Sequence, residues 1–325
     1  MNREVNAPGK RACVIAGALA LIISLAVLPW AARADLRVTA SIPPLHSLVA
    51  QVMTGAGAPE LLIPGGASPH GFSLAPSQAE MLSRSGVLFW VGQGLEAALS
   101  KPIATLARNA TVVAMADVKD LVRLKRRSAD LGDGHGHDHG HGHGHGHNQT
   151  AGGDDPHYWL DPVNAKVMID VIARTLGAAA PAQKALFLAN ADDAKSRIDA
   201  MLDEFKHRLD PLKNRPFIVF HDAYQYLETR FGLHTAGILA VDPERPAGAR
   251  HVNELRELLR QRDIICLFTE PQLSSRLADR LVKGTATRIA TLDPLGSGMA
   301  PGAGLYERMM TANLTALESC LTARP

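Results

Sequence analysis

Three histidines in this sequence lie beside predicted strand ends or helix starts. His70 follows a predicted strand, within the glycine- and proline-rich segment 63–74. His157 precedes Asp161-Pro162, which has the signature of a helix N-cap and first helical residue. His221 directly follows an apolar predicted strand. Functional side chains in open α/β sheets gather beyond the carboxyl ends of the strands, so the three imidazoles are candidate ligands of one metal ion.

A carboxylate extends this set. Asp293 follows the last predicted strand and is a candidate fourth donor. Three imidazole nitrogens and one carboxylate oxygen suit tetrahedral zinc, which has no geometric preference of its own. Taken singly, each residue has a structural explanation: solvation for His70, packing of a polar face for His157, a buried hydrogen bond for His221. Asp293 in turn has the alternative of capping a turn. The combination favours a zinc site more strongly than any single member does.

Acid should compete with the metal at such a site, because neutral imidazole is the form that binds. With a reference pKa near 6.5, three coordinating histidines predict that binding weakens by roughly two to three decades between about pH 7.5 and pH 5.5. A flat pH profile would contradict coordination by three histidines.

A second group of histidines lies in the segment 125–155, where the composition changes abruptly. Glycine and histidine alternate at its centre, and this alternation offers no apolar face for a core. We therefore expect a disordered loop inserted into the first half of the protein. Its histidines suit weak, exchanging binding of a divalent metal, and the alternative is a solvated spacer with accidental affinity. These candidate auxiliary ligands are His135, His137, His139, His141, His143, His145 and His147.

The N-terminus predicts export. Lys10-Arg11 precedes an apolar run, 12–28, and a small-residue pattern at 32–34. This order is typical of a secretory signal peptide, 1–34, which is removed by cleavage. An uncleaved membrane anchor is the alternative, because the run approaches the length that spans a bilayer.

Export also determines the expected oxidation state of the cysteines, because thiols oxidise outside the cytoplasm. Cys266 and Cys320 remain once the leader is removed. A disulfide between them is the expected outcome, and two buried free thiols are the alternative. In the chain-entropy model, a loop of this size is stabilised by about 4 kcal/mol.

The elements that position these residues alternate between strands and helices. Four apolar, β-branched runs in each half predict βαβ units and parallel sheets. The sequence therefore predicts an α/β protein with two lobes, 35–180 and 214–325. The predicted strands are 37–41, 60–63, 87–91, 111–114, 217–220, 235–239, 264–269 and 287–291.

One long helix is predicted between the lobes. From Ala182 to Asp210, apolar residues recur every three or four positions and form one stripe. A helix of this length runs about 40 Å at about 1.5 Å per residue, long enough to pack against both lobes. We expect a rigid connection, 181–213, and small relative motions of the lobes. The alternative is two shorter helices with a break near Asn190.

Length and charge narrow the class of function. The chain has 325 residues, of which 46% are hydrophobic, enough for two α/β domains. The leader holds four of the 34 basic residues and one of the 32 acidic residues, so the mature chain is close to neutral. This balance excludes nucleic acid as a partner.

Several motifs together resemble the zinc-binding periplasmic components of ABC importers, within the metal-binding cluster of substrate-binding proteins. The resemblance covers nearly the whole mature chain. It implies two α/β lobes joined by a rigid helix, with zinc in the interlobe cleft held by His70, His157 and His221. The matching stretches are SIPPL at 41–45, GASPHGFSL at 66–74, PHYWL at 156–160, FHDAY at 220–224, TEPQ at 269–272 and TLDPLG at 291–296.

The resemblance leaves the fourth donor open. Asp293 matches the family's aspartate, whereas Pro69 replaces a carboxylate that some relatives use and cannot bind a metal. The fourth donor is therefore expected to be Asp293 or water. Manganese-binding relatives tend to carry glutamate at the position of His221, and the histidine favours zinc because nitrogen donors suit zinc better.

The resemblance also implies the function. We expect a monomeric periplasmic protein that captures Zn²⁺ with high affinity and delivers it to a membrane permease with its cytoplasmic ATPase, without catalysis. One alternative is a zinc buffer or metallochaperone in which the loop does the main work and no permease takes part. The other is an exported zinc hydrolase, which would need an open coordination position and a general base. The sequence contains no His-Glu-x-x-His motif.

Overall fold

The computed structural model describes Met1 and residues 36–127, 153–240, 243–244, 247–261 and 264–322. The predicted signal peptide and the seven loop histidines lie outside these residues, so both stay predictions. The chain from Leu36 onwards belongs to one compact unit. Within the described ranges, no helix is both long enough and apolar enough to cross a membrane.

The first lobe is built on a four-stranded parallel sheet with strand order β2-β1-β3-β4. The inner strands β1 and β3 are buried along their whole length. This burial is expected for parallel strands that helices cover on both faces. The two inner strands align with Val38 opposite Val87. The strands are β1 Val38–Ala40, β2 Glu60–Leu61, β3 Val87–Trp90 and β4 Thr111–Ala114.

The second lobe repeats this pairing scheme with the order β6-β5-β7-β8, again all parallel. In both sheets the second strand along the chain pairs with one edge of the first strand, and the third strand pairs with its other edge. Ligands of open α/β sheets bind at this point of reversal, beyond the carboxyl ends of the strands. Each observed strand agrees with its predicted run to within two residues at either end, which confirms the α/β class. The strands are β5 Phe217–His221, β6 Thr235–Ala240, β7 Cys266–Thr269 and β8 Arg288–Thr291.

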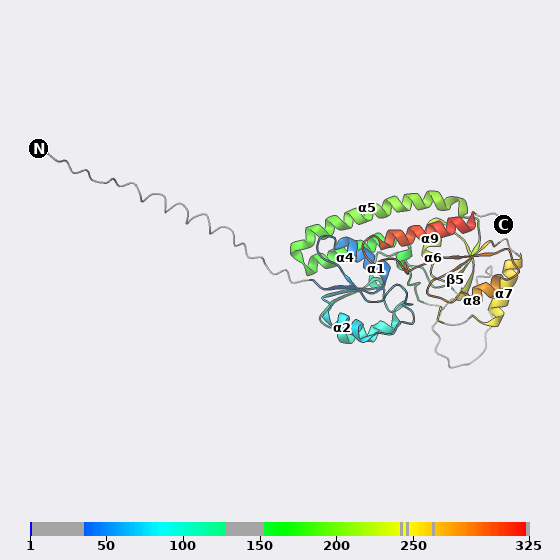
Figure 1. Ribbon diagram of the computed structural model, residues 1–325, viewed down its shortest axis with the longest axis horizontal. Coiled ribbons are helices and arrows are strands. Elements are labelled where there is room, and N and C mark those ends of the chain that lie inside the picture. Colours follow the sequence, from blue (N-terminus) through cyan, green and yellow to red (C-terminus); the bar gives the residue numbers. More distant parts are fainter. Residues whose placement is uncertain (2–35, 128–152, 241–242, 245–246, 262–263, 323–325) are drawn as a thin grey trace. The chain divides into compact units, whose positions relative to one another are not determined.

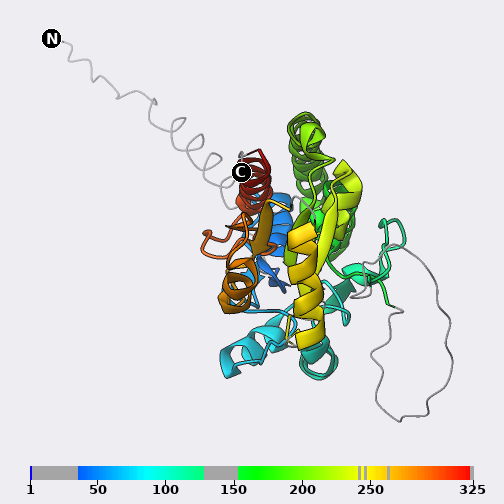
Figure 2. The ribbon, with the colours of Figure 1, turned by 90° about the vertical axis from the view of Figure 1, so that its right-hand side faces the viewer.

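Helices pack against these sheets and against one another. Three of them, α1, α2 and α4, carry proline at the helix start, where the missing N–H has no intrahelical partner to lose. Figure 2 shows α7, in yellow, against the second sheet, where it contacts β6. The helices other than α5 are α1 Pro43–Val52, α2 Pro76–Arg84, α3 Ser100–Leu106, α4 Pro162–Ala179, α6 Gln225–Phe231, α7 Ala249–Gln261, α8 Arg276–Val282 and α9 Leu305–Leu321.

The long helix α5, Lys184–Leu209, lies along both lobes (Figure 1). Asn190 lies inside this continuous helix, and its Nδ2 donates to the carbonyl oxygens of Val52 at 2.9 Å and Thr54 at 2.8 Å. The prediction of one long helix is therefore confirmed, and α5 has no break near Asn190. Its buried stripe consists of Phe187, Ala191, Ala194, Ile198, Met201, Phe205 and Leu209.

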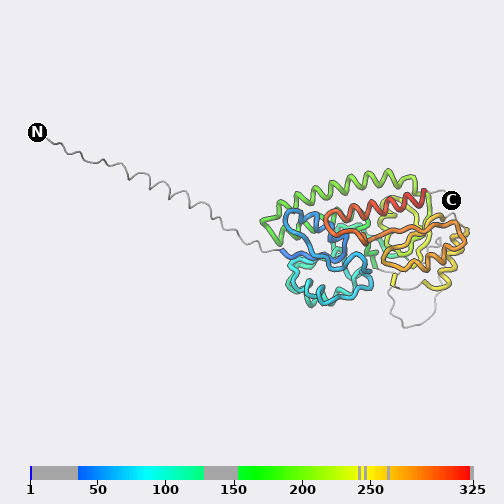
Figure 3. The backbone as a smooth tube through the Cα atoms, viewed as in Figure 1, coloured from blue at the N-terminus to red at the C-terminus, as the bar shows by residue number. Residues whose placement is uncertain are grey.

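The last helix, α9, ties the second lobe to the first. It starts beside α1 and runs back toward the second lobe (Figure 3). The Ser47 hydroxyl of α1 donates to Ala303 O at 2.8 Å and accepts the Tyr306 N–H at 2.9 Å. A disulfide joins Cys320 of α9 to Cys266 of β7, which confirms the predicted bond. Together with α5, these contacts hold the two lobes in one unit.

Candidate metal centre

The three predicted histidine ligands converge. His70, His157 and His221 each offer a ring nitrogen within 4.8 Å of the other two. Their ring centroids lie 5.5 Å, 5.1 Å and 4.9 Å apart. His157 and His221 are buried and His70 is half-buried. The part of the chain that the structure describes holds no other such group of histidine, cysteine and carboxylate side chains.

His221 occupies the reversal point of the second sheet. It is the last residue of β5, and β7 pairs with β5 and is followed directly by Glu270. His221 Nδ1 consequently lies 3.3 Å from Glu270 Oε1. A carboxylate in this place orients the imidazole and leaves its Nε2 for a metal.

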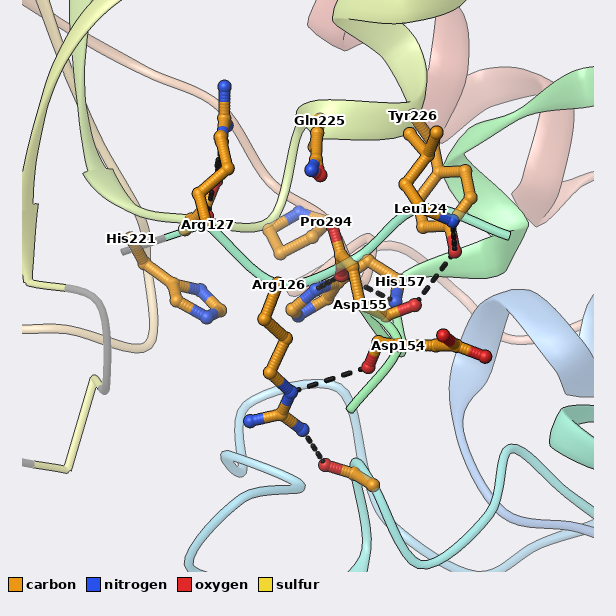
Figure 4. A network of polar contacts seen from close by, with 12 residues as sticks. Leu124, Arg126, Arg127, Asp154, Asp155, His157, His221, Gln225, Tyr226 and Pro294 are labelled. Atoms are coloured by element: carbon orange, nitrogen blue, oxygen red, sulfur yellow. Dashed lines mark hydrogen bonds and ion pairs between the residues drawn. The ribbon is translucent and has the colours of Figure 1, made fainter. Parts of the chain in front are cut away.

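His157 is held by the carboxylate of Asp155 (Figure 4). Asp155 Oδ1 lies 2.7 Å from His157 Nδ1 and also accepts the His157 backbone N–H at 3.0 Å. Tyr226 of α6 donates its hydroxyl to the Asp155 carbonyl oxygen at 2.8 Å. Tyr226 of the second lobe thereby supports His157, a candidate ligand from the first lobe. This role of Asp155 was not predicted, although an acid two residues before a candidate ligand was a visible signal.

The loop that carries His70, between β2 and α2, contacts the second lobe at two points. The Ser68 hydroxyl donates to Glu244 Oε1 at 2.7 Å. The Gly65 carbonyl oxygen accepts the hydroxyl of Ser297. These contacts hold the loop, which has no regular secondary structure, against the second lobe, so His70 reaches the other two histidines.

Burial keeps two of the imidazoles neutral. Burial, reinforced by the neighbouring His221, lowers the pKa of His70 and of His157 well below the usual 6.5. Burial also acts to lower the pKa of His221, but the adjacent Glu270 carboxylate outweighs it and the pKa lies above its usual value. Because neutral imidazole is the metal-binding form, His70 and His157 are ready to bind at neutral pH.

The histidines line a cavity of about 20 Å³. A cavity of this size holds about one water-sized particle and no organic molecule. Much of its remaining wall is apolar and includes Leu95, Trp159, Leu273 and Leu295. An apolar wall limits the access of solvent to an ion held by the histidines.

Asp293 does not join the three histidines. The group of mutually close ligand atoms does not include its carboxylate. Asp293 Oδ1 instead accepts the backbone N–H groups of Leu295 and Gly296, each at 3.0 Å, and Gln272 Nε2, also at 3.0 Å. The carboxylate thus caps a turn, which was the structural alternative for this residue. Coordination by Asp293 stays a prediction that competes with this observed role.

The two ends of the histidine-rich segment, as far as the structure describes them, are anchored beside the histidines (Figure 4). Lys125 and Asp154 form an antiparallel bridge, and Lys125 Nζ donates to Asp154 Oδ1 at 2.7 Å. Arg127 reaches into the second lobe, where it pairs with Asp222 and with Glu228. The side chains of both acids are only 7% exposed, so Arg127, which is itself half-buried, is the counter-ion of two buried carboxylates.

Comparison with known proteins identifies the family. The family model described as "ZnuA: Zinc-uptake complex component A periplasmic" matches residues 38–320. The chain belongs to this zinc-uptake family. One relative is the "High-affinity zinc uptake system protein ZnuA" of Brucella suis biovar 1 (strain 1330). It is 41% identical over 305 residues, which cover 88% of this chain and 91% of the relative.

Solved structures share the fold of this zinc-uptake family member. One described as "Crystal structure of ZnuA" matches with a TM-score of 0.73 at 20% identity, covering 88% of this chain and 99% of the other. Another, "Crystal structure of 138-173 ZnuA deletion mutant plus zinc bound", matches with a TM-score of 0.72 at 20% identity. That match covers 89% of this chain and 99% of the other. At this identity the likeness concerns the fold alone.

Proposed function

We propose that this member of the zinc-uptake family captures Zn²⁺ in the periplasm and delivers it to the membrane permease of an ABC importer. One observation carries the proposal. The ring nitrogens of His70, His157 and His221 lie within 4.8 Å of one another around a cavity with room for one small ion. In this proposal the ion is the cargo, and the three imidazoles are its main ligands.

The donor set supports zinc as the cargo. Three imidazole nitrogens are characteristic zinc ligands, whereas magnesium, calcium and manganese prefer oxygen donors. Zinc imposes no geometry of its own, so the convergence of the donors is sufficient for binding. Each of two ligands also has a supporting carboxylate, Asp155 behind His157 and Glu270 behind His221. Such partners raise the affinity of histidine ligands for a metal.

The shape of the site supports binding rather than catalysis. A hydrolase would need space for a substrate beside the metal, and the cavity of about 20 Å³ leaves none. We therefore assign no enzymatic reaction to the site. The partners that follow from the proposal are a membrane permease and its cytoplasmic ATPase. Export by the predicted signal peptide, 1–34, would bring the protein to the periplasm, where it acts as a monomer.

The fourth donor and the loop complete the proposal. Asp293 and water are the expected alternatives for the fourth position. The loop histidines, from His135 to His147, would supply weaker auxiliary sites that raise the local concentration of the ion. The disulfide between Cys266 and Cys320 stabilises the second lobe and takes no part in binding.

The experiment that tests the main site replaces one ligand. His221→Ala should abolish tight zinc binding, measured by competition with a chromogenic chelator, while circular dichroism stays that of the wild type. His207→Ala is the matched control, because His207 lies exposed on α5. A His221→Ala protein that still binds one zinc tightly would refute the assignment.

A second experiment separates transport from buffering by the loop. Deletion of 134–147 should remove weaker metal equivalents and leave one tight zinc per chain. If the tight site disappeared with the loop, the buffer hypothesis would replace the transport hypothesis. Metal analysis and titration of the mature protein, with and without the loop, measure both quantities.

A further inference from the structure

One polar side chain in the cavity wall has an oxygen without a partner. Gln272 follows β7 by three residues and lines the same cavity as the three histidines. Its Oε1 is buried and makes no hydrogen bond within the described part of the chain. A buried carbonyl oxygen without a partner is unfavourable, and its position in the wall of the histidine cavity makes an ion in that cavity a candidate partner.

The neighbours of Gln272 determine which end of its amide is the oxygen. The Ser297 hydroxyl has one hydrogen, and it donates this hydrogen to the Gly65 carbonyl oxygen, which can only accept. Ser297 Oγ must therefore accept from Gln272, and the contacting amide atom is the nitrogen. Asp293 Oδ1 accepts from the same nitrogen at 3.0 Å. Asp293 Oδ1 and Ser297 Oγ thus both require the nitrogen of the Gln272 amide on their side. Oε1 then lies on the opposite side of the amide, where no described residue donates to it.

Other polar side chains near the cavity contact neighbouring groups. Glu270 Oε1 also makes no hydrogen bond within the described residues, but it lies 3.3 Å from His221 Nδ1, and its carboxylate does not belong to the group of mutually close ligand atoms. The Ser68 hydroxyl donates to Glu244. Asp293 Oδ1 accepts from two backbone N–H groups besides Gln272. Gln272 Oε1 differs from these atoms, because it lies in the cavity wall and, within the described residues, has neither a hydrogen bond nor an ion pair.

From this geometry we propose that Gln272 Oε1, in place of Asp293 or water, supplies the fourth donor to the ion held by His70, His157 and His221. The inference rests on the proposed function, because it places the oxygen at that same site. Asp293 and Ser297 become positioning residues, which act by fixing the Gln272 amide. The assignment explains why Asp293 lies close to the site without joining the histidine group.

The test compares Gln272→Leu with a matched variant, Gln225→Leu. Gln225 is also half-buried, its Nε2 donates to Lys125 O at 2.9 Å, and its Oε1 is buried without a partner among the described residues. It does not line the cavity. Gln272→Leu should weaken zinc binding by at least about tenfold, the lower limit for loss of groups that support a metal site. Gln225→Leu should bind zinc like the wild type.

Two further measurements separate coordination from a structural effect. The visible absorption bands of bound Co²⁺ should shift in Gln272→Leu, because water replaces the amide oxygen, and should not shift in Gln225→Leu. Asp293→Asn keeps one oxygen that accepts the Gln272 N–H, so it should cost less zinc affinity than Gln272→Leu. The opposite order, or a Gln272→Leu protein with unchanged affinity and cobalt spectrum, would overturn the assignment. Tight zinc binding by the wild type tests the proposed function separately.

Discussion

Asp155 Oδ1 lies 2.7 Å from His157 Nδ1. The same oxygen accepts the backbone N–H of His157 at 3.0 Å, so the carboxylate fixes both the ring and the backbone of this residue. With Nδ1 bound in this way, only Nε2 of His157 can face the other histidines. The contact therefore selects the tautomer that the proposed metal site requires.

Removal of this carboxylate should weaken the site. Asp155→Ala leaves the His157 ring free to rotate and its Nδ1 without a partner, and we expect zinc affinity to fall by about 10- to 100-fold. Chelator competition measures the affinity. Asp154→Ala is the control, since the Asp154 carboxylate pairs with Lys125 and Arg123 instead. Equal affinities of the two variants would contradict a supporting role for Asp155.

Arg127 should be important for stability. Its guanidinium pairs with Asp222 and Glu228, whose side chains are only 7% exposed. Arg127→Ala therefore removes the counter-ion that these two buried carboxylates have in the described part of the chain. Removal of one partner from such a buried group costs about 3–5 kcal/mol of unfolding free energy. Urea unfolding measures this loss.

A surface ion pair provides the comparison for Arg127. Lys195 pairs with Asp170 and Asp192, whose side chains are 42% and 76% exposed, so Lys195→Ala should cost at most about 1 kcal/mol. If the two substitutions cost the same, Arg127 is no more than a surface contact.

Glu96 should make stability depend on pH. It is fully buried, and its Oε2 accepts the N–H groups of Val91 at 2.9 Å and Gly92 at 3.1 Å. Burial raises the pKa of Glu96 from 4.5 to about 7. The folded protein therefore holds this proton more tightly than the unfolded chain does. The resulting stabilisation is complete below pH 4.5 and is lost as the pH rises through about 7.

Glu96→Gln tests this dependence because glutamine cannot titrate and keeps an acceptor oxygen. Relative to the wild type, the variant should gain about 1–3 kcal/mol of unfolding free energy between about pH 5 and pH 8. Urea unfolding of both metal-free proteins at several pH values gives the difference. A difference that stays constant over this range would show that Glu96 does not titrate there.

The disulfide should stabilise the second lobe. It joins residues separated by 54 positions, Cys266 in β7 and Cys320 in α9. Restriction of the unfolded chain by a loop of this size is worth about 4 kcal/mol in the chain-entropy model. A reductant should accordingly lower the urea midpoint of the wild type and leave that of the double variant Cys266→Ala, Cys320→Ala unchanged. A wild-type midpoint that does not respond to complete reduction would contradict this role.

Sequence determined the elements of the fold because their signals are local. Apolar β-branched runs coincide with the strands, and the three- and four-residue spacing from Ala182 to Asp210 predicted α5 as one helix. The types of the main candidate ligands were also visible, since His70, His157 and His221 lie beside strand ends or helix starts. Export and the number of remaining cysteines were sufficient to predict the disulfide.

Only the tertiary structure decided which side chains meet. Glu270 and His221 are neighbours because β7 pairs with β5, and no local pattern specifies that pairing. Asp293 has the residue type and strand-end position of a ligand, yet its hydrogen bonds to Leu295, Gly296 and Gln272 tie it to a turn. A residue type states which bonds a side chain can form. The packing of distant segments determines which of those bonds form, because it decides which donors and acceptors lie within hydrogen-bonding distance of one another.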